Sequence, residues 1–415
     1  MQKMQRQFNR TLKFIKRNSL NKTMLKDFDW PLFILVILIA LCGVVCIFAA
    51  TASPIDDETM ATMTMLEIIQ TQPTEYAGLQ LLWIVLGVLC MVFVLSIDYE
   101  FWERHSNTIY WLNIAMLTVV LFMESQRGGM SGWFQWGSNM QRTIQPSEFA
   151  KLAIIISLAR TFARREKPIT TLAELIPMLA YVGLPFLLII LQPDYGTAMV
   201  FIVIFGVMLF SSGVSYKLLV GIAATALLML VAIWYMMNNA EDNFRLNRIL
   251  VFLDPTLDPT GSGMQSANAR IAVGSGGLWG KGMFSSGSFA SLNYIPDDHT
   301  DFIFAIVCEA FGFVGAGAIV LALLIILLRM VVMSYQAADK FGRYVIIGIV
   351  GMMLFHIVEN VGMVIGILPV TGIPLPFISY GGSNLMTNMI GMGFVFSINM
   401  RSKSKKKAPK KVAKL

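Results

Sequence analysis

A polar turn that runs directly into a long apolar stretch holds the residues best placed for chemistry. Residues 296–304 read PDDHTDFIF, and the sequence is apolar from Phe302 onward. Asp301 should therefore lie at the mouth of a membrane-spanning helix, where water meets hydrocarbon, a suitable place for a reactive carboxylate. The residues alone also allow a simpler role, because Asp301 with Thr300 could cap the N-terminus of that helix.

A second polar block, QPSEFAK at residues 145–151, opens another apolar run. Pro146 and Ser147 are typical of a helix start. Glu148 and Lys151 share one helix face, where their charges can neutralise one another. Two roles stay open for this block: an ion pair within the membrane, or a site where Lys151 meets a polyanionic ligand.

Other ionisable groups lie beside or inside apolar runs. In QPDYGT, residues 192–197, Asp194 either caps a tight turn or contacts a ligand. Glu309, His356 and Glu359 lie deeper, where ionisable groups are costly and usually paired. For these three we predict buried hydrogen bonds between helices.

A glycine-rich stretch follows a long polar interval. The stretch reads GSGG at residues 274–277 and GKG at residues 280–282, so backbone N–H groups and Lys281 could face phosphate oxygens. It matches neither a Walker A motif nor a dinucleotide fingerprint. The other cations of this interval that we consider are Arg245, Arg248 and Arg270.

Residues 366–383 form an apolar segment that cannot be one regular helix, because Pro369, Pro374 and Pro376 remove backbone donors. Irregular backbone is tolerated at membrane depth only where protein or a water-filled cavity covers it. We therefore expect this segment to line a cavity shared with the large polar loop.

The elements that must position these residues are membrane helices. Of 415 residues, 56% are hydrophobic and 14% charged, which excludes a soluble globular domain. The four cysteines fall in apolar runs and predict no disulfide framework. The fold class is therefore an all-α polytopic membrane protein with ten transmembrane helices. The predicted spans are 30–52, 79–97, 107–123, 147–163, 171–192, 196–212, 217–237, 302–333, 343–368 and 383–400.

The distribution of Lys and Arg sets the expected topology. No Lys or Arg occurs between Ser53 and Gly78, whereas basic residues cluster near Arg160. By the positive-inside rule both termini are cytoplasmic, and residues 238–301 form a large extracytoplasmic loop between helices 7 and 8. Three parts result: a basic N-terminal segment without a removable signal peptide, a transmembrane domain and a basic tail, at residues 1–29, 30–400 and 401–415. The basic ends indicate contact with membrane lipids and not with nucleic acid.

Five blocks in order resemble the SEDS family (shape, elongation, division and sporulation; FtsW/RodA/SpoVE), the membrane glycosyltransferases of peptidoglycan synthesis. The blocks are QPSEFAK, QPDYGTA, IAVGSGGLWGKG, PDDHTDFIFA and GILPVTGIPLPFISYGGS, and the resemblance runs from about Phe28 to Met400. The last block looks most like the RodA branch, which serves elongation. Gly132 stands before Trp133 where relatives often have Arg, and Asp297 stands where Glu is usual. Arg127 or Arg142 could replace the missing charge.

The resemblance implies a function and a site. It implies polymerisation of lipid II into glycan strands at the bacterial inner membrane, a class B penicillin-binding protein as partner, and Asp301 as the essential carboxylate on the extracytoplasmic side. The residues that it suggests for substrate binding are Trp133, Glu148, Lys151, Asp194, Arg245, Arg248, Gln265, Ser266, Arg270, Lys281, His299, Thr300, Ser379 and Tyr380.

The chemistry expected of such an enzyme needs a base and positive charge. Asp301 would act as general base on the acceptor hydroxyl, and cations would stabilise the undecaprenyl pyrophosphate leaving group. A divalent cation, Mg²⁺ or Mn²⁺, could bridge the phosphates, and no organic cofactor is expected. Two rival classes stay open: a lipid II flippase and a non-catalytic scaffold. The division or sporulation role of a paralogue is a further alternative.

Overall fold

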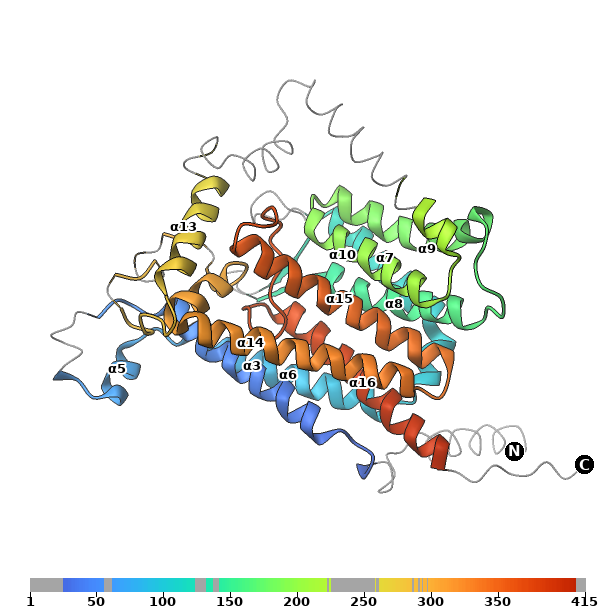
Figure 1. Cartoon of the computed structure of the whole chain (residues 1–415), viewed down its shortest axis with the longest axis horizontal. Coiled ribbons are helices and arrows are strands. Elements are labelled where there is room, and N and C mark those ends of the chain that lie inside the picture. Colours follow the sequence, from blue (N-terminus) through green and yellow to red (C-terminus); the bar gives the residue numbers. More distant parts are fainter. Residues whose placement is uncertain are drawn as a thin grey trace, which may run out of the picture.

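The fold is a bundle of helices (Figure 1). The computed structural model describes residues 25–55, 62–123, 132–136, 142–221, 224, 258, 261–285, 287–289, 292, 294–296 and 298–407. The helices are α3 (Trp30–Thr51), α5 (Met65–Thr71), α6 (Glu75–Ser96), α7 (Tyr99–Leu121), α8 (Pro146–Ala163), α9 (Leu172–Leu191), α10 (Tyr195–Ser211), α13 (Ser262–Ser275), α14 (Ile303–Gln336), α15 (Lys340–Val364) and α16 (Gly382–Lys407).

Several of these helices can cross a membrane. Within the described residues, α3, α6, α9, α14 and α15 are long and apolar enough to do so, and α10 is a shorter apolar helix of 17 residues. The protein is therefore membrane-embedded. Each predicted span except the seventh overlaps one of the helices given above. The seventh, residues 217–237, begins with a few helical residues and lies mostly outside the described residues. The count of ten and the position of the large loop stay predictions.

Some boundaries differ from the expected ones. Helix α7 begins at Tyr99, well before the predicted span, and α16 continues past Met400 to Lys407. The sequence did not suggest the short antiparallel pair β1 (Phe134–Trp136) and β2 (Arg142–Ile144), in which Phe134 lies opposite Ile144. This pair leads directly into α8.

Aspartates define where several helices begin. Asp29, Asp98, Asp194 and Asp339 occupy the N-cap positions of α3, α7, α10 and α15, and each side chain accepts a hydrogen bond from a backbone N–H of the first turn. Such a cap satisfies one orphan donor and typically stabilises a helix by about 1 kcal/mol. Polar residues between apolar runs thus set the helix starts.

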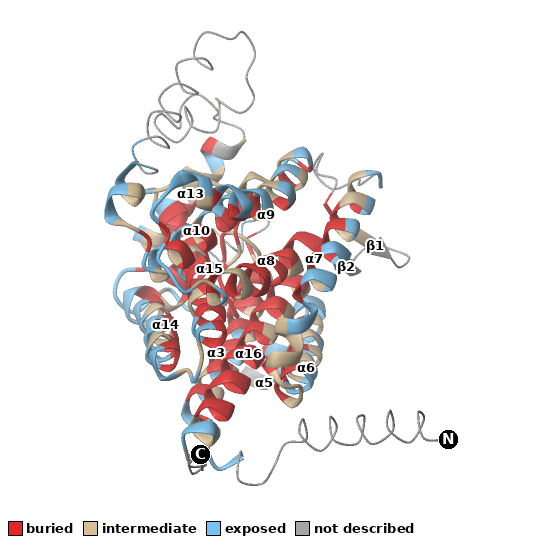
Figure 2. Cartoon of the chain, turned by 90° about the vertical axis from the view of Figure 1, so that its right-hand side faces the viewer, coloured by how far each residue is buried: buried red, intermediate tan, exposed pale blue. Residues whose placement is uncertain are grey.

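The core lies where α8, α15 and α16 meet, and these three helices are the most fully buried (Figure 2). The outer helices expose large apolar side chains, among them Leu38 on α3, Leu89 on α6 and Leu187 on α9. A soluble protein rarely shows so much contiguous apolar surface, whereas hydrocarbon covers it in a membrane.

The segment between α15 and α16 is irregular, as its prolines predict, and it is covered by protein. Ile373, Leu375 and the run 376–379 are buried. On one side the segment meets α3 at Gly43, where an added Cβ would lie 2.5 Å from the Phe377 carbonyl oxygen. Phe377 has a φ of 65°, a left-handed conformation that is strained for a bulky residue and persists because its surroundings hold it.

The close approach at Gly43 can be tested by substitution. Gly43→Ala should lower the midpoint of thermal unfolding in detergent, because overpacking against fixed backbone typically costs about 1–3 kcal/mol. Gly206→Ala in α10 is the matched control, since no atom lies within 4 Å of its added Cβ. There alanine should be neutral or stabilising by up to about 1 kcal/mol. Equal midpoints for the two variants would contradict the packing described here.

Candidate functional site

Asp301 lies in the turn that precedes α14. The helix begins at Ile303, and Phe302 occupies its N-cap position. Asn360 of α15 holds this turn: its Nδ2 donates to the Asp301 carbonyl oxygen at 2.7 Å and to the Ile373 carbonyl oxygen at 2.8 Å. One buried amide therefore joins the Asp301 turn to the irregular segment.

The Asp301 carboxylate lies over a glycine of that segment. Gly372 has a φ of 76°, and a Cβ added there would be 3.1 Å from Asp301 Oδ2. Asp301 is half-buried. Glycine thus serves two needs, a left-handed backbone and room for the carboxylate.

An aromatic cluster borders the same turn. The Tyr76 ring lies 4.5 Å from the His299 ring and 5.1 Å from the Tyr380 ring, measured between centroids. The Tyr380 N–H donates to the His299 carbonyl oxygen at 2.9 Å. His299 and Tyr380 were predicted, and Tyr76, from the start of α6, was not.

Ser379 is buried, and its side chain hydrogen-bonds to the backbone of its own segment. Its Oγ accepts from the Leu375 N–H at 2.8 Å, and its carbonyl oxygen accepts from Gln80 Nε2 at 3.3 Å. Thr371 donates to the Glu359 carboxylate at 2.9 Å. These contacts tie the irregular segment to α6 and α15.

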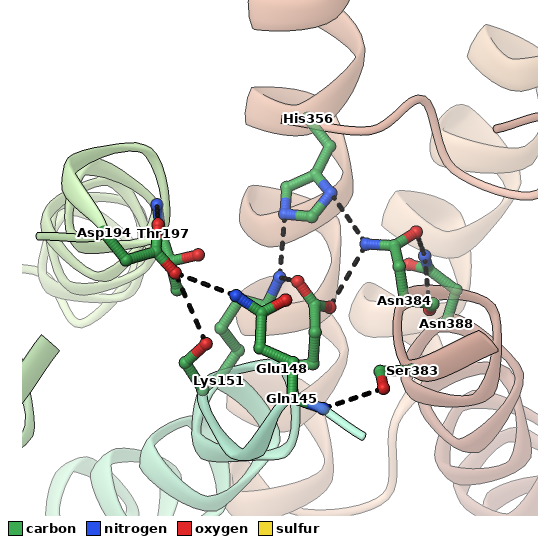
Figure 3. A network of polar contacts seen from close by, with 10 residues as sticks. Gln145, Glu148, Lys151, Asp194, Thr197, His356, Ser383, Asn384 and Asn388 are labelled. Carbon is green, nitrogen blue, oxygen red and sulfur yellow. Dashed lines mark hydrogen bonds and ion pairs between the residues drawn. The ribbon is translucent and has the colours of Figure 1, made fainter. Parts of the chain in front are cut away.

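Lys151 and Glu148 form the ion pair that their spacing suggested (Figure 3). Lys151 Nζ lies 2.7 Å from Glu148 Oε1 and 3.1 Å from His356 Nε2. The Lys151 side chain is 1% exposed. Its ammonium therefore faces protein groups in this conformation and offers no surface to a ligand.

Asparagines of α16 complete this cluster. Asn384 Nδ2 donates to Glu148 Oε2 at 3.1 Å and lies 3.4 Å from His356 Nδ1, while Asn388 Nδ2 donates to Asn384 Oδ1 at 2.9 Å. The buried polar cluster, defined as Glu148, Lys151, His356, Asn384 and Asn388, thus connects α8, α15 and α16 (Figure 3).

Asp194 has the capping role that its turn suggested. Its Oδ1 accepts from the Thr197 N–H at 3.0 Å, and its Oδ2 accepts from Gln145 Nε2 at 3.0 Å and from Ser147 Oγ at 3.5 Å. The Gln145 N–H in turn donates to Ser383 Oγ at 2.9 Å. The starts of α8, α10 and α16 therefore meet at one end of the bundle.

The two described cations of the glycine-rich region, Arg270 and Lys281, have different surroundings. Arg270 on α13 is exposed and lies against Gly366, where an added Cβ would be 2.7 Å from Arg270 Cδ. Lys281 Nζ instead binds Glu309 Oε1 at 2.8 Å. Glu309 also accepts from Ser275 Oγ at the end of α13 and from the Phe289 N–H.

Hydrogen bonds between helices were predicted for Glu309, His356 and Glu359. His356 makes them, to Lys151 of α8 and Asn384 of α16. Glu309 instead binds mainly the residues that follow α13, and Glu359 binds Thr371 of the irregular segment, so the three do not form one network.

The remaining predicted residues are placed as follows. Gln265 and Ser266 are half-buried on α13, Thr300 is half-buried beside Asp301, and Trp133 is half-buried just before β1. Arg127, Arg245, Arg248 and Asp297 lie outside the described residues. The structure therefore brings Asp301, His299, Thr300, Ser379 and Tyr380 together, and it places Glu148 and Lys151 deeper among helices.

Asn360, Asn384, Asn388 and Tyr76 were absent from the predicted site. Asn360 follows Glu359, and an amide deep in an apolar helix was the signal available, because buried polar groups need partners. In the part of the chain that the structure describes, no group of three or more His, Cys, Asp and Glu side chains could hold a metal ion. The site can offer a half-buried carboxylate, donors on the irregular segment and an exposed cation.

The helical bundle and this site define a class of protein: a helical membrane protein in which an irregular, proline-rich segment packs on a turn that carries a carboxylate. Residues 29–404 match the model of the FtsW/RodA/SpoVE cell cycle proteins. The chain belongs to this family, which confirms the resemblance drawn from its sequence blocks.

Individual relatives and solved structures support the same family assignment. The chain is 35% identical to stage V sporulation protein E of Bacillus subtilis, over 79% of this chain and 88% of that one. It is 34% identical to the peptidoglycan glycosyltransferase MrdB of Escherichia coli, over 77% and 84%. A chain of a peptidoglycan synthase complex superimposes with a TM-score of 0.73 at 26% identity, covering 90% and 98%. The rod shape determining protein RodA of Thermus thermophilus gives 0.63 at 25% identity, covering 90% and 96%.

The buried ion pair should be coupled energetically. Lys151→Met leaves Glu148 buried without its cation, and breaking one partner of such a pair typically costs about 3–5 kcal/mol. The double variant Glu148→Gln/Lys151→Met should regain part of the lost stability, read from thermal unfolding midpoints. Arg104→Met is the control, because the Arg104–Glu100 pair is exposed and should contribute less than about 1 kcal/mol. Additive losses in the double variant would contradict the coupling.

The Asn360 link should control the local order of the site. Asn360→Asp keeps the shape but removes the donor, which leaves two carbonyl oxygens unpaired at a typical cost of about 1–3 kcal/mol each. Hydrogen exchange of peptides covering 298–305 and 370–376 should therefore quicken. Asn268→Asp is the matched control, because Asn268 also donates to a carbonyl oxygen, that of Tyr294, but at the surface. Unchanged exchange in the Asn360 variant would refute the link.

Proposed function

We propose that this protein is a peptidoglycan glycosyltransferase that polymerises lipid II, with Asp301 as general base. The observation that carries the proposal is the Asp301 turn: Asn360 ties its backbone to the irregular segment, and Gly372 leaves room there for the Asp301 carboxylate. A carboxylate that is held in place and half-exposed can accept a proton from a sugar hydroxyl. The relative named peptidoglycan glycosyltransferase MrdB supports the reaction class.

In the proposed reaction the 4-hydroxyl of an acceptor sugar attacks C1 of a lipid-linked donor. The new C–O bond forms as the bond from C1 to undecaprenyl pyrophosphate breaks, which inverts that carbon. Asp301 takes the hydroxyl proton, and pyrophosphate leaves with the bonding electrons. Arg270 is the exposed candidate to neutralise its charge, since it lies beside Gly366 at the start of the irregular segment.

A divalent cation is compatible with the residues present. Mg²⁺ is usually held by one or two carboxylates together with substrate phosphates. Asp301, half-buried in the turn before α14, could supply one such oxygen to Mg²⁺ or Mn²⁺, whereas Asp298 of the same turn is buried beside His299. The ion would neutralise charge on the pyrophosphate.

The proposal includes an orientation and a partner. In this proposal the chain crosses the bacterial inner membrane ten times, and both termini lie in the cytoplasm. The Asp301 end of the bundle then lies on the extracytoplasmic side, where lipid II is polymerised. The similar chain from a complex that coordinates polymerization and crosslinking supports a class B penicillin-binding protein as partner. Elongation is the role that we favour over division or sporulation, on the ILPVTGIPLPFISYGG block.

Asp301→Asn should lower glycan-strand formation from lipid II by about 10²–10⁴ fold, the usual contribution of a general base. The assay uses purified full-length protein with its partner and added Mn²⁺, and thermal unfolding confirms that the variant is folded. Glu67→Gln is the control, because Glu67 is exposed on α5 and Gln can keep its capping contact with Thr64. Full activity of Asp301→Asn would show that another residue is the base. If neither the wild type nor Asp301→Asn forms polymer, but the protein carries lipid II across vesicle membranes, the result would favour a flippase.

A further inference from the structure

The glycine-rich loop, residues 276–282, completes the backbone of α14 where that helix is broken. Gly312 has non-helical angles, φ 66° and ψ −170°. Four hydrogen bonds join loop and helix: Lys281 N to Glu309 O at 2.8 Å, Gly282 N to Ala310 O at 3.1 Å, Phe313 N to Gly277 O at 2.9 Å and Val314 N to Leu278 O at 3.1 Å. These bonds pair backbone groups on both sides of the break, so the loop and the break form one unit.

Close approach explains why glycine stands at two loop positions. A Cβ added at Gly276 would lie 1.9 Å from the Cys308 carbonyl oxygen, and one at Gly280 would lie 2.2 Å from the Ala310 carbonyl oxygen. The loop is thus seated on α14 by backbone contact. This seat leaves the side chains of Leu278 and Trp279 directed away from it, 64% and 78% exposed.

Helix α3 places this unit at a membrane boundary. Its 22 residues rise about 33 Å, close to the roughly 30 Å thickness of a hydrocarbon core. In the last turns of α3, the Phe48 ring lies 6.1 Å from the Phe284 ring, and Ile55 pairs with Ser285. The residues that follow the loop therefore lie level with the C-terminal end of α3.

Helix α14 gives an independent measure of the same level. Arg329 binds Asp29, the N-cap of α3, at 2.8 Å, so Arg329 lies level with the other end of α3. The rise from Arg329 back to the break at Gly312 is about 26 Å at 1.5 Å per residue. The break therefore lies near the boundary that the Phe48 contact also indicates.

The surface at this boundary is apolar. Phe313 and Val314 are 73% and 47% exposed beside Leu278 and Trp279. Exposed apolar residues continue along α14 in a stripe of helical spacing: Val314, Leu321, Ile325, Leu328 and Val332. The nearby charges of Lys281 and Glu309 neutralise one another. Tryptophan is enriched where hydrocarbon meets the headgroups of a bilayer.

We propose that the loop is a membrane anchor: Leu278, Trp279 and Phe313 insert at the boundary between headgroups and acyl chains of a lipid bilayer. The anchor fixes the depth of α13, which ends at Ser275 directly before the loop and carries Arg270. The bilayer thereby sets the position of a helix that packs beside the irregular segment. This inference is independent of the proposed reaction.

Fluorescence quenching tests the anchor. The full-length protein is placed in vesicles of phosphatidylcholine that carries bromine at the 6,7 or 11,12 acyl positions, and wild type is compared with Trp279→Phe. The difference isolates Trp279 among the eight tryptophans. We expect this component to lose intensity most with bromine at the shallower position and to resist aqueous iodide. Thermal unfolding confirms that the variant is folded.

Trp111→Phe provides the matched control. Trp111 is 60% exposed at the middle of α7, so its component should be quenched most by the deeper bromine. Quenching of the Trp279 component by iodide, without quenching by brominated lipid, would overturn the anchor in favour of water exposure. Resistance to both quenchers would overturn it in favour of cover by protein, such as a second copy of the chain.

Discussion

Backbone that is buried at membrane depth without a helix must find every hydrogen bond within the protein, and this constraint shapes the site. The segment between α15 and α16 meets it with side chains from other helices. Asn360 supplies a donor to Ile373, Gln80 supplies one to Ser379, and Ser379 accepts from Leu375. The same side chain of Asn360 also binds the Asp301 turn. The contacts that make the irregular segment stable therefore also position the carboxylate.

The buried polar cluster performs a different task. Lys151 and Glu148 bring opposite charges into the centre of the bundle, and His356 and Asn384 form one further hydrogen bond to each of them. Apolar packing alone specifies little in a membrane, since lipid is as apolar as the helix surfaces. A polar cluster with geometric demands selects one arrangement of α8, α15 and α16. That arrangement in turn places the start of α8 beside Asp194 and Ser383.

Sequence reasoning reached the helical architecture, the family and the ion pair, because these depend on apolar length, ordered motifs and a spacing of three residues. It could not reach the Asn360 link, whose two acceptors lie 59 and 13 residues away along the chain. Nor could it show that His356 meets Lys151 across 205 residues. It left a capping role for Asp301 open, while the structure gives the N-cap position to Phe302. Propensity is local, and the long-range contacts are decided by packing.

The break at Gly312 has a mechanical consequence for the site. The glycine-rich loop bonds to Glu309 and Ala310 before the break and to Phe313 and Val314 after it. Residues 313–336 rise about 36 Å, more than a typical hydrocarbon core. A helix with such an excess responds to bilayer thickness by changing its tilt. Because the loop bonds to residues on both sides of Gly312, the break is a fixed bend, and a change of tilt in residues 313–336 is passed on to the loop and to residues 303–311. The turn that carries Asp301 directly precedes residue 303, so bilayer thickness acts on the position of that turn.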